Sequence, residues 1–197
     1  MVGRISFLLT ASQLMEKAVP SDPELLELAR QFDHPALAQI YDAYSPGLYR
    51  YAMRLLGDQS LAEDCVAETF SRFLQALQAG RGPRDFLQAY LYRMAHNWMV
   101  DYYRREPLQP VRLTEEHHDG KAGPEEDADR RLRKERLRSA LRKLTPDQQQ
   151  VITLKYLEGW ENEQIARSLR KPVGAVKSMQ HRALAALQRL LNHEEFL

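Results

Sequence analysis

The stretch ENEQIARSLRKPVGAVKSMQHRAL, residues 161–184, predicts two short helices joined by a tight turn. In the first segment, Ile165 and Leu169 are four residues apart, as on one face of a helix. Pro172 suits the first position of a second helix, so residues 170–171 are left to form the turn. A short helix, a tight turn and a basic amphipathic helix are together typical of a helix-turn-helix.

The second helix has a polar face and small residues at its leading end. In a helix-turn-helix this end lies against the DNA, and its free amides attract phosphate, so the small Gly174 and Ala175 would allow close approach. Arg182 can pair with guanine, and Ser178 can bind a base or a phosphate. The candidate residues for binding duplex DNA are Gly174, Ala175, Lys177, Ser178, His181 and Arg182. An ordinary surface face of a helical bundle is the alternative that this fragment leaves open.

A basic helix and a capped helix are expected before this motif. The basic helix runs from Asp129 to Leu144. Thr145 suits the N-cap of the next helix, with Pro146 at its first position and Gly159 after its end. The final helix should bury one apolar face, made of Val176, Met179, Ala183, Leu187 and Leu190.

The first half of the chain is also predicted to be helical. A helix should begin at Pro23, with the preceding aspartate as its N-cap. The His-Pro pair at residues 34–35 should break it. The next helix should be interrupted near the Ser-Pro pair at residues 45–46 and should end at Gly57.

Two longer helices follow, separated by a loop at residues 80–83. Asp58 or Ser60 can cap the first of them. On each helix, apolar residues at spacings of three and four predict one buried face. These faces consist of Ala62, Val66, Phe70, Phe73 and Leu77, and of Leu87, Leu91, Met94, Trp98 and Tyr102. The predicted fold class is all-α.

Composition favours a helical protein of the cytoplasm. Leu, Ala, Arg, Gln and Glu dominate, and these residues favour helix. The chain has a single cysteine, Cys65, which excludes an intrachain disulfide and a cysteine-based zinc site. We expect Cys65 to be a small, semi-buried residue. No apolar run approaches the roughly 20 residues needed to cross a bilayer, so we expect no membrane insertion.

The net charge of +1 hides a strong polarisation along the chain. Residues 1–106 sum to −2, residues 107–129 to −5 and residues 130–197 to +8. This pattern favours a C-terminal part that binds a polyanion, although a solvated, charge-rich helix would explain much of it. Prolines and glycines without periodicity make residues 107–128 an acidic, flexible linker. His117 and His118 lack further ligands at useful spacing, so we expect no metal and no cofactor.

Three stretches resemble parts of one known family. LTPDQQQVITLKYLEGWENEQIARSLRKPVGAVKSMQHRALAALQRLL, residues 144–191, resembles region four of bacterial RNA polymerase sigma factors of the extracytoplasmic-function (ECF) type. LYRYAMRLLGDQSLAEDCVAETFSRFL and FLQAYLYRMAHNWMVDYYRR, residues 48–74 and 86–105, resemble region two. The resemblance implies an N-terminal extension (1–22), a region-two domain (23–106), the linker (107–128) and a region-four helix-turn-helix domain (129–197).

The resemblance implies an initiation subunit that binds core RNA polymerase and directs promoter-specific transcription. Region four would read the minus-thirty-five element, while region two would recognise and help melt the minus-ten element. The minus-ten residues would be Tyr90, Arg93, Asn97, Asp101 and Arg104, next to a loop at residues 80–85 that shapes a base pocket. The polymerase-binding residues would be Glu63, Asp64, Glu68 and Arg72. The implied partners are core polymerase, promoter DNA and an anti-sigma factor, which such proteins often bind.

Several residues depart from the family's pattern. Arg170 stands where a turn glycine is common, and a positive φ there would cost about 1 kcal/mol. Met179 replaces a frequent basic residue, Ala67 replaces a usual glutamine in the polymerase-facing helix, and Tyr90 stands where tryptophan is common. These departures bear on the promoter sequence rather than on the class of function.

Two other classes of function remain open at this point. One is a helix-turn-helix regulator that acts without polymerase, and the other is a helical protein-interaction adaptor. An enzyme is not expected, because the sequence has no phosphate loop, nucleophile motif or metal constellation. The charge pattern also suggests that the +8 segment folds back on the N-terminal part.

Overall fold

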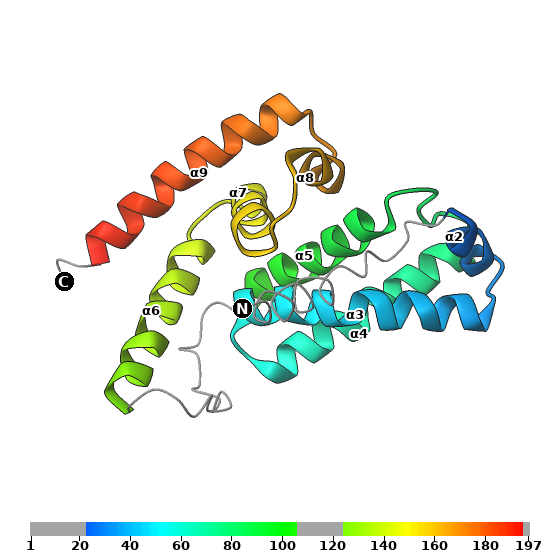
Figure 1. Ribbon diagram of the computed structural model, residues 1–197, viewed down its shortest axis with the longest axis horizontal. Helices are drawn as coiled ribbons and strands as arrows, with labels where there is room; N and C mark the ends of the chain where they lie inside the picture. Colours follow the sequence, from blue (N-terminus) through cyan, green and yellow to red (C-terminus); the bar gives the residue numbers. More distant parts are fainter. Residues whose placement is uncertain (1–22, 106–123, 195–197) are drawn as a thin grey trace, which may run out of the picture.

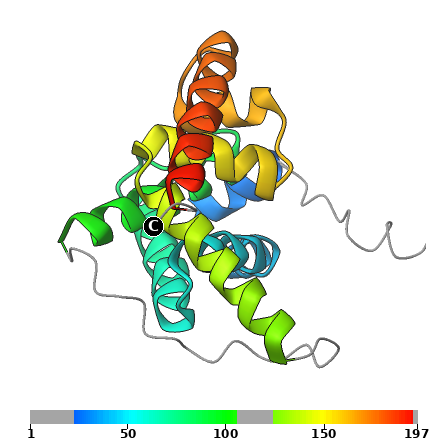
Figure 2. The same ribbon diagram turned by 90° about the vertical axis from the view of Figure 1, so that its left-hand side faces the viewer.

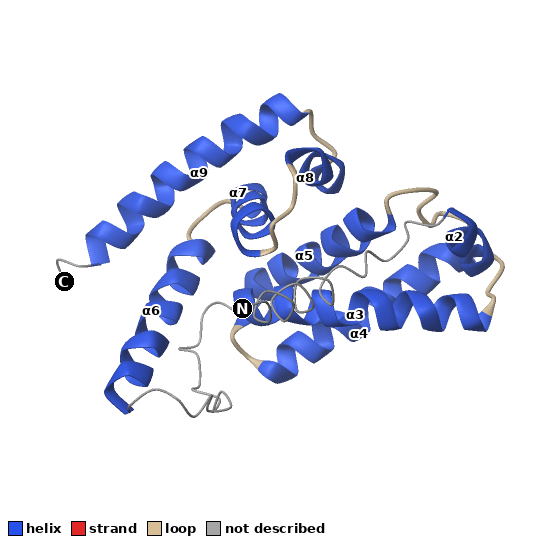
Figure 3. Cartoon of the chain, in the orientation of Figure 1, coloured by secondary structure: helices blue, strands red, loops and turns tan. Residues whose placement is uncertain are grey.

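Helices form the whole of the secondary structure in residues 23–105 and 124–194, the parts of the chain that the computed structural model describes (Figure 3). The predicted all-α class is therefore confirmed. The N-terminal lobe consists of α2 (Pro23–Arg30), α3 (His34–Leu56), α4 (Gln59–Gln78) and α5 (Leu87–Arg105). The C-terminal lobe consists of α6 (Pro124–Arg142), α7 (Pro146–Ile152), the π-helical turn η1 (Thr153–Leu157), α8 (Asn162–Leu169) and α9 (Val173–Glu194).

The two lobes are in contact. Helix α8 packs on α5, and α6 lies beside α3 (Figure 1, Figure 2). Helix α9 lies on the far side of the C-terminal lobe from α3 and α4 (Figure 1). The suggested return of the C-terminal part onto the N-terminal part is thus the arrangement observed. Residues 1–22 and residues 107–123 of the predicted linker lie outside the described residues, whereas residues 124–128 of that linker belong to α6.

Side-chain caps fix the starts of α3 and α4. The Asp33 carboxylate accepts from the Ala36 amide at 2.9 Å, and the Asp58 carboxylate accepts from the Leu61 amide at 2.9 Å. Gly57 ends α3 with φ 73°, in the left-handed region that a glycine adopts without strain. The predicted end at Gly57 and the predicted cap at Asp58 are confirmed. The predicted cap of α2 lies outside the described residues.

The predicted interruption of α3 near residues 45–46 is wrong. The helix continues through Pro46, which has no amide to donate to the preceding turn. Such a proline costs about 3 kcal/mol inside a helix. Tyr44 on one side and Leu48 on the other are both buried, and burying each side chain contributes roughly 1.5–3 kcal/mol. Tertiary packing on both sides therefore outweighs the local cost.

Helices α3, α4 and α5 pack against one another around the core of the N-terminal lobe. The predicted apolar face of α4 is buried as expected. Its members are Ala62, Val66, Phe70, Phe73 and Leu77. Cys65 lies beside this face and is fully buried rather than semi-buried, because its thiol faces the Ala95 carbonyl on α5.

Helix α5 is buried on a wider surface than its sequence pattern predicts. Leu87 and Leu91 are buried as expected, whereas Met94, Trp98 and Tyr102 are only half-buried. A second row is buried instead, namely Ala89, Tyr92, His96 and Met99. The C-terminal lobe packs on α5, so part of this helix is covered by a second lobe.

The C-terminal lobe begins with α6 at Pro124 rather than at Asp129. Thr145 then forms the predicted cap of α7, with a reciprocal bond between its backbone amide and the Gln148 side chain. Helix α9 buries Val176, Met179 and Ala183 as predicted, while Leu187 and Leu190 are partly buried. Met179 belongs to this core, so a basic side chain at position 179 could reach DNA only by leaving the core.

Candidate nucleic-acid interface

Helix α9 has one buried face and one polar face open to solvent. Val176 and Ala183 are both 0% exposed. The side chains predicted to read duplex DNA are all on the exposed face, namely Lys177, Ser178, His181 and Arg182. The Ser178 hydroxyl donates to the Gly174 carbonyl at 3.0 Å, a local bond that a base or phosphate can replace.

The leading end of α9 is unobstructed. Gly174 is exposed, and a Cβ added to it would meet no atom within 4 Å. Ala175, the other small residue, is half-buried. No packing contact in the described chain therefore requires a glycine at position 174. Its small size instead leaves the positive end of the helix dipole accessible to an anion from outside.

The turn between α8 and α9 has a left-handed residue at the position where the resembled family commonly has glycine. Arg170 adopts φ 53° and ψ 44°, the left-handed conformation that usually favours glycine. The Gln180 amide donates to the Asn162 side chain at 2.7 Å and so joins the start of α8 to α9. Lys171 pairs with Asp147 on α7 at 3.0 Å. These contacts fix the angle at which α9 is presented.

A second polar stripe runs along α5. Its members recur at spacings of three and four, which places them on one face of the helix. They are the predicted minus-ten residues Tyr90, Arg93, Asn97, Asp101 and Arg104. Asn97 is exposed, and Arg104 pairs with Asp101 at 2.9 Å.

Within this stripe, Arg93 is influenced by an aromatic ring of its own helix and by an arginine of the other lobe. Its guanidinium lies 5.4 Å from the centre of the Tyr90 ring. Burial, followed by the nearby positive charge of Arg170, lowers the pKa of Arg93. Arg93 and Arg170 come from different lobes, so their like charges oppose the lobe contact rather than supporting it.

Comparison with known families accounts for both surfaces. The model of Sigma-70 region 2 matches residues 40–107, and the model of Sigma-70 region 4 matches residues 134–187. The ECF RNA polymerase sigma factor SigL of Mycobacterium tuberculosis is 31% identical over 150 residues, covering 76% of this chain and 85% of SigL. The chain belongs to the ECF RNA polymerase sigma factors.

Two further relatives agree with this assignment. The ECF RNA polymerase sigma factor BldN of Streptomyces coelicolor is 34% identical over 172 residues, which cover 85% of this chain. The matched part is 65% of BldN's own length. The structure of CnrH in complex with the cytosolic domain of CnrY superposes with a TM-score of 0.63 at 26% identity, covering 88% of this chain and 98% of that one.

In this sigma factor, the predicted polymerase-binding residues lie together on α4. Glu63 and Asp64 are exposed. The Arg72 guanidinium donates to the Glu68 carboxylate at 2.7 Å, so these two half-buried charges balance each other. The part of this cluster that carries net negative charge is therefore Glu63 and Asp64.

The sigma factor's two lobes are joined by a buried histidine that the sequence did not single out. His96 is 2% exposed, with Nε2 3.0 Å from the Pro146 carbonyl oxygen on α7 and Nδ1 2.9 Å from the Tyr51 hydroxyl. The carbonyl can only accept, so Nε2 carries the proton and Nδ1 accepts from Tyr51. Burial lowers the pKa of His96 to about 4, and the Pro146 carbonyl and the Asp147 carboxylate only partly oppose this effect.

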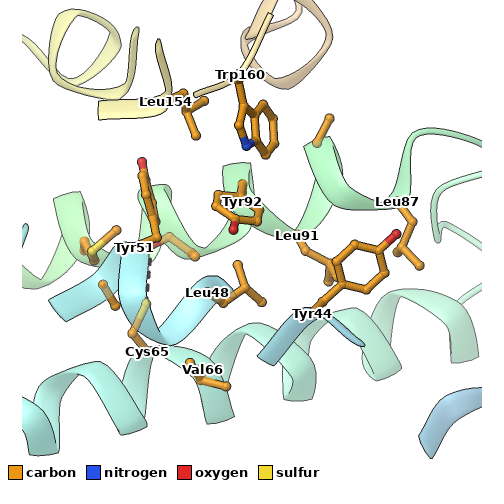
Figure 4. Close-up of a cluster of buried hydrophobic side chains, with 14 of the residues drawn as sticks. Tyr44, Leu48, Tyr51, Cys65, Val66, Leu87, Leu91, Tyr92, Leu154 and Trp160 are labelled. Carbon is orange, nitrogen blue, oxygen red and sulfur yellow. Dashed lines mark hydrogen bonds between the residues drawn. The ribbon is translucent and has the colours of Figure 1, made fainter. Parts of the chain in front are cut away.

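Aromatic and ionic contacts surround this histidine. Trp160 packs on Tyr92 with ring centres 4.8 Å apart (Figure 4). Arg54 on α3 pairs with Glu158 and also donates to the Leu157 carbonyl. Burial raises the pKa of Glu158, although Arg54 acts in the opposite direction. Region four is thus held on region two by specific contacts rather than by net charge alone.

The sequence contained a pattern that could have revealed this contact. Ala89, Tyr92, His96 and Met99 recur at spacings of three and four, so they form a second stripe on α5. A helix with two apolar stripes packs against two neighbours.

Three further findings concern the described residues. Burial raises the pKa of Cys65 to about 12, which makes a reactive thiolate unfavourable. Among the side chains that the structure describes, no group of three or more His, Cys, Asp and Glu residues could hold a metal ion. No helix in residues 23–105 or 124–194 combines the length and hydropathy of a membrane span.

Proposed function

We propose that this chain binds core RNA polymerase and directs it to start transcription at specific promoters. The observation that carries the proposal is the presence of sigma region 2 and sigma region 4 on one chain, in that order. A helix-turn-helix alone would suit many regulators, whereas the pair of regions suits an initiation subunit.

Region four would read the minus-thirty-five element with α9. The exposed face carries Lys177, Ser178, His181 and Arg182, which supply hydrogen-bond donors for base edges and phosphates. The open end at Gly174 would receive a phosphate oxygen. The buried opposite face of α9 keeps this arrangement rigid.

Region two would recognise the minus-ten element with the stripe on α5 and help to separate its strands. A separated strand is held by cations along its backbone and by aromatic and amide groups that contact exposed bases. Tyr90, Arg93 and Asn97 supply one group of each kind within two helical turns. The acidic residues Glu63 and Asp64 on α4 would pair with basic helices of the polymerase.

The chain would act as a specificity subunit in the cytoplasm, and the polymerase would carry out RNA synthesis. No catalytic centre is needed in this chain for that role. The solved complex of CnrH with the cytosolic domain of CnrY supports a second protein partner, which we propose to be an anti-sigma factor.

The decisive experiment is transcription by holoenzyme reconstituted from purified core RNA polymerase and this chain on a genomic promoter library. We expect co-elution of the two and run-off transcripts that share two spaced elements. Binding of a specific duplex without any association with polymerase would instead indicate a stand-alone regulator.

Two variants distinguish a sigma factor from the other alternative, a helical protein-interaction adaptor. Removing the charges of Lys177 and Arg182 together should abolish promoter selection, whereas Arg189→Gln, lower on α9, should leave it intact. An adaptor that keeps only the fold would bind its partner equally well in both variants, and would direct no transcription.

A further inference from the structure

An aromatic residue with an unusual backbone conformation precedes α5. Phe86 has φ 49°, in the left-handed region that bulky side chains rarely adopt, and its side chain is 44% exposed. Its carbonyl accepts from the Tyr90 amide at 3.1 Å, so Phe86 is in register with the first turn of α5. A strained backbone that presents a large apolar ring to solvent is typical of a functional position.

Phe86 extends the candidate minus-ten stripe by one turn. Tyr90, Arg93 and Asn97 follow one another at spacings of three and four on one face of α5, and Phe86 adjoins the start of this face through its bond to the Tyr90 amide. The stripe then begins with two aromatic rings and continues with a cation and an amide. Exposed rings of this kind stack on unpaired bases with little dependence on base identity.

The ring of Phe86 is already occupied by a residue of region four. The guanidinium carbon of Arg167, on α8, lies 4.0 Å from the centre of the Phe86 ring. A guanidinium is planar and stacks on aromatic faces, as a nucleobase does. The neighbouring Arg170 also acts on Arg93 of the same stripe. The helix-turn-helix of region four therefore lies over the leading end of the minus-ten stripe.

We propose that Phe86 is an additional stacking site for an unpaired base of the minus-ten strand, and that Arg167 occupies this site while the two lobes are in contact. This inference rests on the proposed function of region two. A base and the guanidinium cannot lie at the same position on the ring, so the single strand must displace Arg167. The exposed face of α9 is not covered in this way, so the contact restrains minus-ten binding and leaves minus-thirty-five binding free.

The test measures binding of single-stranded DNA to the full chain without polymerase. The probes are short fluorescein-labelled single strands of oligo-dT, oligo-dA and oligo-dC, read by fluorescence anisotropy at low salt. Arg167→Gln should raise the affinity by about two- to fivefold, the range expected for losing one exposed cation–π competitor. The sign is decisive, because removing a cation that contacts DNA lowers the affinity.

Matched variants isolate the ring contact. Arg189→Gln makes the same charge change on α9, where the side chain donates to the Ala185 carbonyl of its own helix, and should lower affinity slightly. Phe86→Asn, which tolerates the left-handed backbone, should weaken binding, while Phe86→Tyr should retain it. In the Phe86→Asn background, Arg167→Gln should no longer raise the affinity.

Two results would overturn the inference. In the first, Arg167→Gln lowers affinity as much as Arg189→Gln does, which would make Arg167 a direct DNA contact. In the second, the effects of Phe86→Asn and Arg167→Gln are simply additive. Neither result depends on polymerase, so the initiation assay can succeed even when this inference fails. Conversely, a failed initiation assay would leave the measured competition between Arg167 and single-stranded DNA unchanged.

Discussion

Acidification should destabilise this sigma factor through His96. The neutral imidazole donates to Pro146 and accepts from Tyr51, so the folded protein has no place for a second ring proton. The pKa of His96 is about 4 in the folded chain, against an ordinary value of 6.5 when the ring is solvated. Between these two values the unfolded chain binds more protons than the folded chain, so stability falls as pH falls.

The size of the effect follows from this difference in pKa. At about 1.4 kcal/mol per pH unit, the fall from 6.5 to about 4 corresponds to about 3 kcal/mol in total. Lowering the pH from about 7.5 to about 5 should remove about 2 kcal/mol of it. With a urea dependence of about 2 kcal/mol per molar, the unfolding midpoint should move by about 1 M.

The assay is urea unfolding followed by circular dichroism, comparing the native chain with His96→Gln across this pH range. Glutamine supplies a donor and an acceptor but does not titrate, and subtraction cancels every contribution that the two chains share. The difference in free energy of unfolding should shrink as pH falls. A difference that stays constant with pH would refute the reasoning, because His96 would then bind protons equally in the folded and the unfolded chain.

Three further substitutions test other parts of the structure. Gly174→Ala should stabilise α9 by up to about 1 kcal/mol, since the added Cβ meets no neighbour. The same substitution should weaken binding of promoter duplex in electrophoretic shifts. Unchanged DNA affinity would show that no phosphate approaches this end of the helix. Arg170→Gly should raise the unfolding free energy by about 1 kcal/mol by relieving the positive φ, and a lower thermal midpoint would contradict this. Arg182→Ala should cost roughly 1–3 kcal/mol on the preferred minus-thirty-five site and relax selectivity at one base pair, as measured on single-base variants. Equal losses on every variant would make Arg182 a phosphate contact.

Local chemistry made most individual elements predictable. Asp58 and Thr145 cap helices through their own side chains, and Gly57 ends α3 through its own backbone freedom. Arg170 has a positive φ at the position where the resembled family commonly has glycine. Two element predictions were wrong. Helix α3 continues through Pro46, because burial of the flanking residues outweighs the local cost of the proline, and α6 begins at Pro124 rather than at Asp129.

The site was predictable only in part. The polar faces of α9 and α5 could be read from helical spacing, because each lies within one helix. Phe86 and Arg167 could not be predicted as site residues, because neither stands out in the sequence. They become relevant only because the fold brings them into contact. His96 belongs to the second stripe on α5 and was likewise not predicted to have a special role.

The sequence by itself determined the all-α class, the order of the helices and the residues that each polar face carries. These depend on backbone propensity, capping and a period of 3.6 residues, which act over a few neighbours along the chain. Only the tertiary structure decided how region four rests on region two, with His96 buried between Tyr51 and Pro146. The charge pattern and the second stripe on α5 indicated that another part of the chain packs there, but not which residues meet. Those residues are far apart in the chain, so their contacts depend on the shapes of two completed lobes.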